Sequence, residues 1–267
     1  MQPTARRGGL IPTHKHKPRQ GIQYSSHAIQ GPPGAGKTVF ASTWPGVLFL
    51  ATESGTHLLE AAEVPIPDWE TFLQALDELQ HTDHKWRTIC LDTVDGLHAR
   101  CVEHVCRVNG WKHPKDEPFT GYDKIKMEWK KGIHRLSGLR NKDGHKLCAL
   151  FIIHTKEEPI TRSVKNERQD TGRVLVRSVL QPHARSILHD CMDFIYAIHI
   201  DTAGKRWLVT QTYDHPSSEA PEVRYEAKAR GAPGRTLPTL IPLDFAALAA
   251  AFDDTFGTNG KEQDNGK

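Results

Sequence analysis

The sequence predicts an α/β protein with a mainly parallel sheet that helices flank, extended by antiparallel strands at the C-terminal side. Three observations predict this class. Short apolar runs alternate with helical patterns up to residue 153, which is typical of parallel sheets. A glycine-rich loop stands between the first apolar run and the first helical pattern. After Pro182, apolar runs follow one another with no long helical pattern between them, which favours antiparallel pairing.

The elements follow from the spacing of apolar residues. Continuous short apolar runs predict strands, and apolar residues three or four apart predict helices, as at Ile125, Trp129 and Ile133. We expect strands at 28–29, 47–51, 88–91 and 147–153, and helices at 38–44, 69–79, 94–108 and 122–139. Further strands are expected at 194–200, 206–212 and 223–227, before a closing helix at 243–252. We see no internal repeat.

The composition is that of an ordinary globular protein. Of the 267 residues, 37% are hydrophobic and 25% are charged. No apolar run approaches the roughly 18 residues that span a bilayer, and no signal peptide is evident, so we expect no membrane contact and a cytoplasmic location. Five cysteines, an odd number, favour reduced thiols. A net charge of +3 is too small to indicate nucleic-acid binding by itself.

The two ends differ from the centre, which predicts one folded domain at 21–253 between a flexible arm at 1–20 and a flexible tail at 254–267. The arm carries Arg6, Arg7, Lys15, Lys17 and Arg19 and no acid, and the tail is polar and glycine-rich. The arm fits either contact with a phosphate backbone or simple solvation.

One loop fits the phosphate-binding pattern G-x-x-x-x-G-K-[ST] without a mismatch. Glycines let the backbone N–H groups surround a phosphate, the lysine supplies a positive charge, and the threonine hydroxyl suits a metal ion. The motif therefore predicts binding of ATP with Mg2+. The residues of this loop are Gly31, Pro32, Pro33, Gly34, Ala35, Gly36, Lys37 and Thr38.

A phosphate loop needs a second oxygen ligand for magnesium at the tip of a neighbouring strand. Asp92 ends the apolar run Thr88–Leu91 and is the Walker B candidate; the alternative is a cap of the following helix. The next residue is Thr93, where many AAA+ motors carry a catalytic glutamate. The base that activates water must therefore come from elsewhere.

Two other strand tips supply candidates for catalysis. Glu53 follows the strand at 47–51 and would polarise the attacking water, unless it is a solvated loop acid. His154 follows the strand at 147–153 and would sense the third phosphate, unless its role is structural. Because parallel strands end at one edge of the sheet, Glu53, Asp92 and His154 are expected to lie together.

With these residues placed, the chain resembles the RecA-like branch of P-loop ATPases, and phage-encoded AAA-family ATP-binding proteins that act as single-strand annealing recombinases. The resemblance spans about residues 22–250. Its shared motifs are GPPGAGKT, Glu53-Ser54-Gly55, Asp92-Thr93-Val94-Asp95, Gly121-Tyr122, His154 and Ala227-Lys228-Ala229-Arg230-Gly231. The last of these is similar to the Lys-x-Arg-Gly element of RadA and DnaB-type ATPases.

This resemblance implies an ATPase stimulated by single-stranded DNA, assembled as a homo-oligomeric ring or filament in the host cytoplasm if phage-encoded. Lys228 and Arg230 would reach the nucleotide of the next subunit, unless they belong to a solvated basic loop. A single-strand binding protein or a helicase would be a further partner. The chain is shorter than full recombinases, so the ATPase core is better supported than recombination.

Two rival functions stay open. A nucleotide-gated partner or loader of a replicative helicase would bind ATP with little direct DNA contact. A small-molecule kinase is disfavoured because no arginine-rich lid segment follows the core. DNA contacts are expected from the polar stretch at 156–177, which has no aromatic residue and is equally well explained as a disordered surface loop.

The segment from residue 98 to residue 120 raises two further questions. Zinc ligands are suggested by a cluster of histidines and cysteines, but Cys101 and Cys106 are five apart, roughly 140° around an ideal helix, which disfavours one site. The loop at 110–120 is expected over the nucleotide or against a neighbouring subunit. The full cluster is His98, Cys101, His104, Cys106 and His113.

Overall fold

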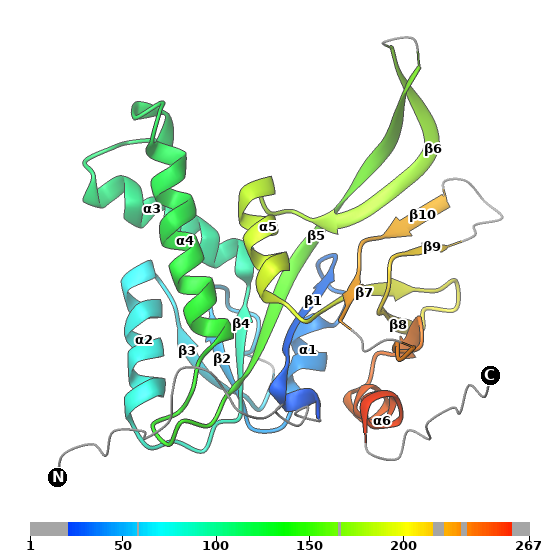
Figure 1. Cartoon of the computed structure of the whole chain (residues 1–267), viewed down its shortest axis with the longest axis horizontal. Coiled ribbons are helices and arrows are strands. Elements are labelled where there is room, and N and C mark those ends of the chain that lie inside the picture. Colours follow the sequence, from blue (N-terminus) through cyan, green and yellow to red (C-terminus); the bar gives the residue numbers. More distant parts are fainter. Residues whose placement is uncertain (1–20, 58, 165–166, 216–221, 231–233, 258–267) are drawn as a thin grey trace, which may run out of the picture.

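Parallel strands form the centre of one sheet, in the order β7-β1-β5-β4-β2-β3. The computed structural model describes residues 21–57, 59–164, 167–215, 222–230 and 234–257. These strands are β1 (Ser26–Gly31), β2 (Val47–Ala51), β3 (Ala62–Pro65), β4 (Thr88–Asp92), β5 (Cys148–Val164) and β7 (Phe194–Ile200). Their carboxyl ends meet at one edge, at the top of Figure 1.

Antiparallel strands extend the sheet beyond β7. The strands β8 (Arg206–Val209) and β11 (Lys228–Ala229) both pair with β7, and β12 (Leu240–Pro242) pairs with β8. Beyond the central sheet, the outer part of β5 pairs with β6 (Glu167–Ser178). The strand β6 also pairs with β10 (Glu222–Tyr225), which pairs in turn with β9 (Tyr213–His215). The predicted class is therefore confirmed: a mainly parallel sheet flanked by helices, with antiparallel strands on the C-terminal side.

Helices cover both faces of the sheet (Figure 1). One face carries α2 (Trp69–His81), α3 (Val94–Val108), α4 (Gly121–Ser137) and α5 (Pro182–Cys191), and the other carries α1 (Lys37–Ser42) and α6 (Phe245–Phe256). Neighbouring residues of β1 show this division, since Ala28 packs in the first cluster and Ile29 in the second. Short 3-10 turns stand at Ile22–Tyr24 (η1) and Pro114–Asp116 (η2).

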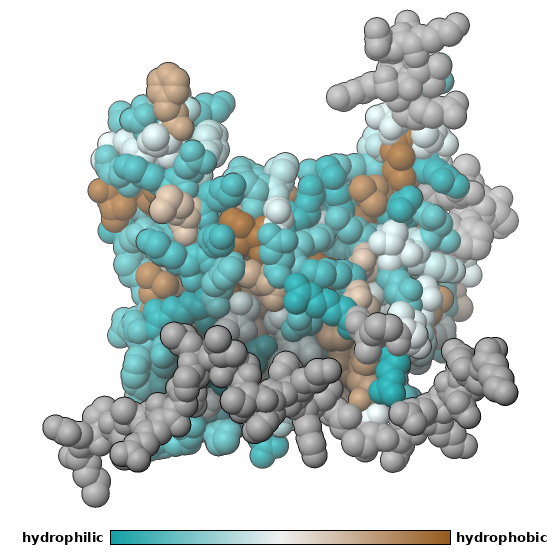
Figure 2. Space-filling model, viewed as in Figure 1, coloured by the Kyte–Doolittle hydropathy of each residue, from teal (hydrophilic) through white to brown (hydrophobic). Residues whose placement is uncertain are grey.

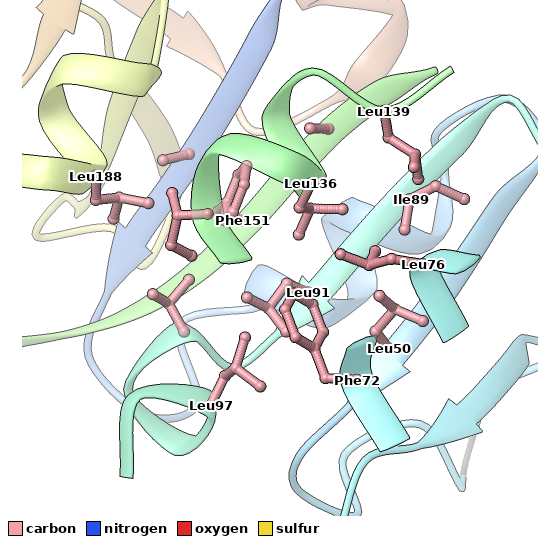
Figure 3. Packing of buried hydrophobic residues seen from close by; sticks show 14 of the residues in the cluster. Leu50, Phe72, Leu76, Ile89, Leu91, Leu97, Leu136, Leu139, Phe151 and Leu188 are labelled. Carbon is pink, nitrogen blue, oxygen red and sulfur yellow. The ribbon is translucent and has the colours of Figure 1, made fainter. Parts of the chain in front are cut away.

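The larger core lies between the sheet and the helices α2 to α5. Figure 3 shows leucines and aromatic rings from these helices meeting the side chains of β2, β4 and β5. Trp69, Phe72 and Trp129 are fully buried there. Gly132 of α4 allows this packing, because a Cβ at that position would lie 2.3 Å from Cη2 of Trp69. The two helices therefore approach closely at a site where only glycine fits.

Most predicted elements are present, and the differences have physical causes. The structure adds β3 and the ten-residue helix α5, and it carries α6 to Phe256, past the predicted domain end at residue 253. The stretch at 156–177 is a paired hairpin of β5 and β6, not a loop. Where its strands are described they are exposed for much of their length, with a buried residue such as Val176 only near the inner end, so little apolar alternation marks the stretch. The predicted arm at 1–20 and residues 258–267 lie outside the described residues.

Two projections rise from the carboxyl edge of the sheet (Figure 1). One is the helical hairpin of α3 and α4, whose tip is the segment at 110–120. The other is the β5–β6 ribbon. Figure 2 shows that the surface between these two projections is recessed. Among the described residues, no helix is long and apolar enough to cross a membrane.

Candidate nucleotide-binding and hydrolysis site

The phosphate loop connects the end of β1 to the start of α1. Gly34 and Gly36 have φ angles of 76° and 92°, which strain any residue other than glycine. The Lys37 amine donates hydrogen bonds to the carbonyl oxygens of Gly31 at 2.9 Å and Pro32 at 2.8 Å. Burial lowers the pKa of Lys37, and the carboxylates of the site oppose that shift. The loop thus holds a buried cation at the edge where phosphates would bind.

Thr38 and Asp92, which the sequence predicts as ligands of a metal ion, are in direct contact. Thr38 Oγ1 donates a hydrogen bond to Asp92 Oδ2 at 2.8 Å, joining the first turn of α1 to the end of β4. Burial raises the pKa of Asp92, and the bond from Thr38 opposes that shift. A hydroxyl beside a buried carboxylate is a donor set that fits Mg2+. Gly55 lies beside this pair, since a Cβ there would be 3.8 Å from Thr38 Oγ1 and 3.9 Å from Asp92 Oδ2, at ordinary contact distance.

Glu53 is held by the residue that follows Asp92. Thr93 Oγ1 donates a hydrogen bond to Glu53 Oε1 at 3.0 Å, and the Thr93 amide donates to Thr52 Oγ1 at 2.9 Å. Thr93 also caps α3 by accepting from the Gly96 amide at 3.3 Å. The position after Asp92 therefore carries no acid of its own but orients the carboxylate of a neighbouring strand tip.

His154 is paired with Asp95, whose role the sequence left unassigned. Asp95 Oδ2 lies 2.9 Å from His154 Nδ1, and Asp95 Oδ1 accepts from the His154 amide at 3.2 Å. Because an ionised carboxylate only accepts hydrogen bonds, Nδ1 carries the proton that it donates to Asp95, and Nε2 is the ring nitrogen that this bond leaves unused. The sequence signal that could have found this pair was spacing, since Asp95 follows Asp92 by three residues and lies in the first turn of α3.

The predicted strand tips lie together around Lys37. The register pairs Gly31 with His154 across β1 and β5. Ligand atoms of Glu53, Asp95 and His154 lie within 4.8 Å of one another. Three carboxylates, one imidazole and one ammonium group therefore converge beside the phosphate loop, an arrangement suited to orienting water against a bound phosphate.

Lys228 and Arg230 lie elsewhere, at the amino ends of the strands. Lys228 belongs to β11, which pairs with the start of β7. Its amine donates to the carbonyl oxygen of His189, and Arg230 donates to the carbonyl of Asp190 at 3.2 Å and to Asp193 Oδ1 at 3.3 Å. Both cations thus hold the C-terminus of α5, and the structure does not bring them to this chain's own phosphate loop.

A cavity of about 490 Å³ adjoins the loop on the side of α1. Val39 and Phe40 of α1 and its C-cap Thr43 line the cavity, together with Arg206 and Leu243. A Cβ on Gly36 would lie 3.7 Å from atoms of both Arg206 and Leu243, so those side chains stand close to the loop. The size is within the range of small-molecule sites, roughly 300–1,000 Å³.

The histidines and cysteines of α3 have separate partners. His98 packs edge-on against Trp129 with ring centroids 5.0 Å apart, His104 contacts Glu70, and His113 caps η2. Cys101 and Cys106 are buried, and burial raises the pKa of both thiols. Across the residues that the structure describes, the one group of three with metal-ligand spacing is Glu53, Asp95 and His154.

Comparison with known proteins agrees with this geometry. A family model described as an AAA domain matches residues 24–230, which include the phosphate loop, Asp92, His154 and Arg230. No curated protein matches the chain. The matched region covers most of the sequence and contains the phosphate loop together with Glu53, Asp92 and His154. The chain therefore belongs to the AAA domain family of P-loop ATPases.

Proposed function

We propose that this protein is a RecA-like enzyme that hydrolyses ATP to ADP and phosphate, in an oligomer that acts on single-stranded DNA in phage-type recombination, annealing or replication. The observation that carries the proposal is the convergence of Lys37, the Thr38–Asp92 pair, Glu53 and His154 at one sheet edge. Each of these groups has a role in moving a phosphoryl group to water.

The roles follow from chemistry and position. The loop amides and Lys37 bind the phosphates, and Thr38 and Asp92 hold Mg2+, which when bound neutralises charge on the phosphate oxygens. Glu53 orients the attacking water and accepts its proton. His154 presents Nε2 toward the phosphate and reports its loss. The adenosine part of ATP occupies the cavity between α1 and Arg206.

The site is shared between subunits. Lys228 and Arg230 lie at the amino edge of the sheet, and β1 is six residues long. At ~3.3 Å per residue, about 20 Å separates that edge from the phosphate loop. These cations are therefore suited to the nucleotide of a neighbouring subunit, where they would stabilise charge on the transferring phosphoryl group.

Mixing two inactive variants tests the sharing. Lys37→Ala and Arg230→Ala should each abolish turnover, and Arg230→Ala should still bind nucleotide. Mixed together they should regain activity, because some interfaces then join an intact loop to an intact arginine. Mixing Lys37→Ala with the double variant Lys37→Ala/Arg230→Ala is the control and should stay inactive. An Arg230→Ala protein as active as wild type would end the proposal of a shared site.

The tip of the α3–α4 hairpin supports the proposed binding of single-stranded DNA. Phe119 is 88% exposed, and Val108, Tyr122 and Met127 are also exposed there. Figure 2 shows apolar atoms at the outer end of this projection. Exposed aromatic rings beside backbone-binding cations are the usual means of holding single strands without sequence preference. The neighbouring lysines are Lys112, Lys115, Lys124 and Lys126.

The β5–β6 ribbon offers fewer free charges than its composition suggests. Lys156 and Arg177 both pair with Glu158. Base stacking is therefore assigned to the α3–α4 tip, and the ribbon would contribute phosphate contacts on the other side of the edge. Phe119→Ala should weaken binding of an oligonucleotide, with about 1–3 kcal/mol lost for each unstacked base.

ATP turnover with and without oligo(dT) tests the whole assignment. Stimulation by DNA, with a steep dependence on protein concentration and none in Lys37→Ala, is expected. Turnover that ignores DNA would favour the alternative, a nucleotide-gated partner or loader of a replicative helicase. Transfer of phosphate to an acceptor other than water would exclude both.

A further inference from the structure

A second cavity lies at the amino edge of the sheet, opposite the phosphate loop. It measures about 560 Å³ and is formed where the chain enters β1, β4 and β5. Part of the lining precedes each of these strands, whereas the phosphate loop follows β1 at its other end. The cavity therefore lies about one strand length from the phosphate loop. The lining residues that matter are Tyr24, Trp86, Arg87, Arg140, His145 and Lys146.

The lining is positively charged and contains no acidic side chain. Lys146 donates to the carbonyl oxygen of Tyr24 at 3.0 Å, and Arg140 donates to the carbonyl oxygen of Gly144 at 2.9 Å. These acceptors are neutral. Within the part of the chain that the structure describes, Arg87, Arg140 and Lys146 form no ion pair with a carboxylate. By contrast, nearby Lys142 is paired with Asp83 and stands outside the lining.

Two aromatic rings complete the cavity wall. Tyr24 is 40% exposed, and Trp86 is half-buried with Lys85 over its ring at 5.2 Å. Cations bind phosphate oxygens, and the faces of aromatic rings stack on bases. We propose that this cavity binds a nucleotide unit of single-stranded nucleic acid, with the phosphate on Arg87, Arg140 and Lys146 and the base against Trp86 or Tyr24.

In the sequence, residues 1–20 precede the lining residue Tyr24 and carry Arg6, Arg7, Lys15, Lys17 and Arg19 without an acid. A basic segment would be repelled by a basic lining, whereas both attract the same polyanion. Positive charge in both the lining and the adjoining sequence favours a polymer over a free mononucleotide. The site is separate from ATP hydrolysis and shares only its nucleic-acid ligand with the proposed function.

Fluorescence anisotropy of labelled (dT)20 at several salt concentrations tests the proposal, with ADP and Mg2+ saturating the phosphate loop. Arg87→Gln/Arg140→Gln should weaken binding about tenfold at low salt. It should also reduce the slope of log K against log salt by about 1.4, because each of the two lost phosphate contacts contributes ~0.7 to the slope. Lys142→Gln removes a charge from the same surface outside the lining and should change neither quantity. DNA-free ATP turnover should be the same in all variants.

A second arm uses thymidine 5′-monophosphate and the tryptophan fluorescence of wild type and Trp86→Phe. Quenching by (dT)20 that is lost in Trp86→Phe supports binding of single-stranded DNA at the cavity. If the mononucleotide quenches the fluorescence as strongly as (dT)20 does, the site is assigned to free nucleotides instead. Equal affinities and salt slopes for the double variant and Lys142→Gln would overturn the proposal. Melting curves control for folding, and if the double variant melts early, Arg140→Gln alone carries the test, because its exposed side chain contacts only a carbonyl.

Discussion

Both carboxylate oxygens of Asp95 contact His154, one at the backbone amide and one at Nδ1. The contact joins the first turn of α3 to β5, two elements 59 residues apart in the sequence. It fixes both the position of the imidazole and its tautomer, so that Nε2 is the nitrogen available to the site. Asp95 is therefore a positioning residue for the proposed phosphate sensor.

Replacing Asp95 with asparagine should lower kcat by about 100-fold, the usual scale for a misplacement near 1 Å, and leave KM for ATP nearly unchanged. The amide cannot hold the protonated Nδ1 as the carboxylate does. Steady-state kinetics of Asp95→Asn measure this effect. Asp123→Asn, in the first turn of α4, is the matched control. An unchanged kcat would remove Asp95 from the mechanism.

Thr93→Val should impair both catalysis and stability, because one hydroxyl contacts Glu53 and caps α3. Loss of the cap costs about 1 kcal/mol of unfolding free energy. Thr93→Ser keeps the hydroxyl and should restore turnover. Urea unfolding and ATPase assays separate the two effects. Equal turnover in the valine and serine variants would show that Glu53 needs no such partner.

Gly132→Ala should destabilise the fold without touching the nucleotide site. The new Cβ would lie 2.3 Å from Trp69 Cη2, so α2 and α4 must separate or the indole must move. Overpacking of this kind costs about 1–3 kcal/mol. Ser137→Ala on the same helix should stay within about 0.5 kcal/mol of wild type. Similar melting temperatures for both variants would contradict the close approach of the helices.

Stability should fall as pH drops from about 6.5 toward 4. Burial lowers the pKa of both His27 and His98 from 6.5 to about 4. In this window the unfolded chain binds more protons than the folded one, so protons favour unfolding. Each imidazole should remove on the order of 2 kcal/mol between pH 7 and pH 5.

His98→Leu tests that assignment, because His98 Nε2 is buried and has no hydrogen-bond partner among the described residues. The variant should be as stable as wild type at pH 7 and lose less stability at pH 5. Urea unfolding at the two pH values measures both. An identical pH dependence in variant and wild type would rule His98 out as a source of acid sensitivity.

Local sequence signals predict much of the fold. The helix at 94–108 is recovered with the predicted bounds, because apolar residues recur on one face and Thr93 caps its start. The phosphate loop and Asp92 follow from spacing and from the strand that precedes each. The β5–β6 ribbon was not predictable in the same way, since its strands are held mainly by pairing, and Val176 near its inner end is the residue that joins a buried cluster.

Contacts between distant segments account for most of what the sequence left open. The Asp95–His154 pair depends on the register of β5 against β1 and β4, which no local pattern encodes. The amino-edge cavity is lined by three segments that precede β1, β4 and β5 and lie more than fifty residues apart in the sequence. None of these segments forms a motif by itself. The meeting of strand tips at the carboxyl edge was predictable because parallel strands end there, whereas side-chain pairs that depend on strand register were not.

The C-terminus of α5 has a consequence for assembly. Lys228 and Arg230 already have three acceptors there: two helix carbonyls and the Asp193 carboxylate. Under the proposed function, a neighbour's nucleotide must displace these acceptors before either cation can serve it. Subunits that meet without bound ATP would offer no phosphate to replace the acceptors at the end of α5. Association of subunits is therefore expected to depend on nucleotide occupancy.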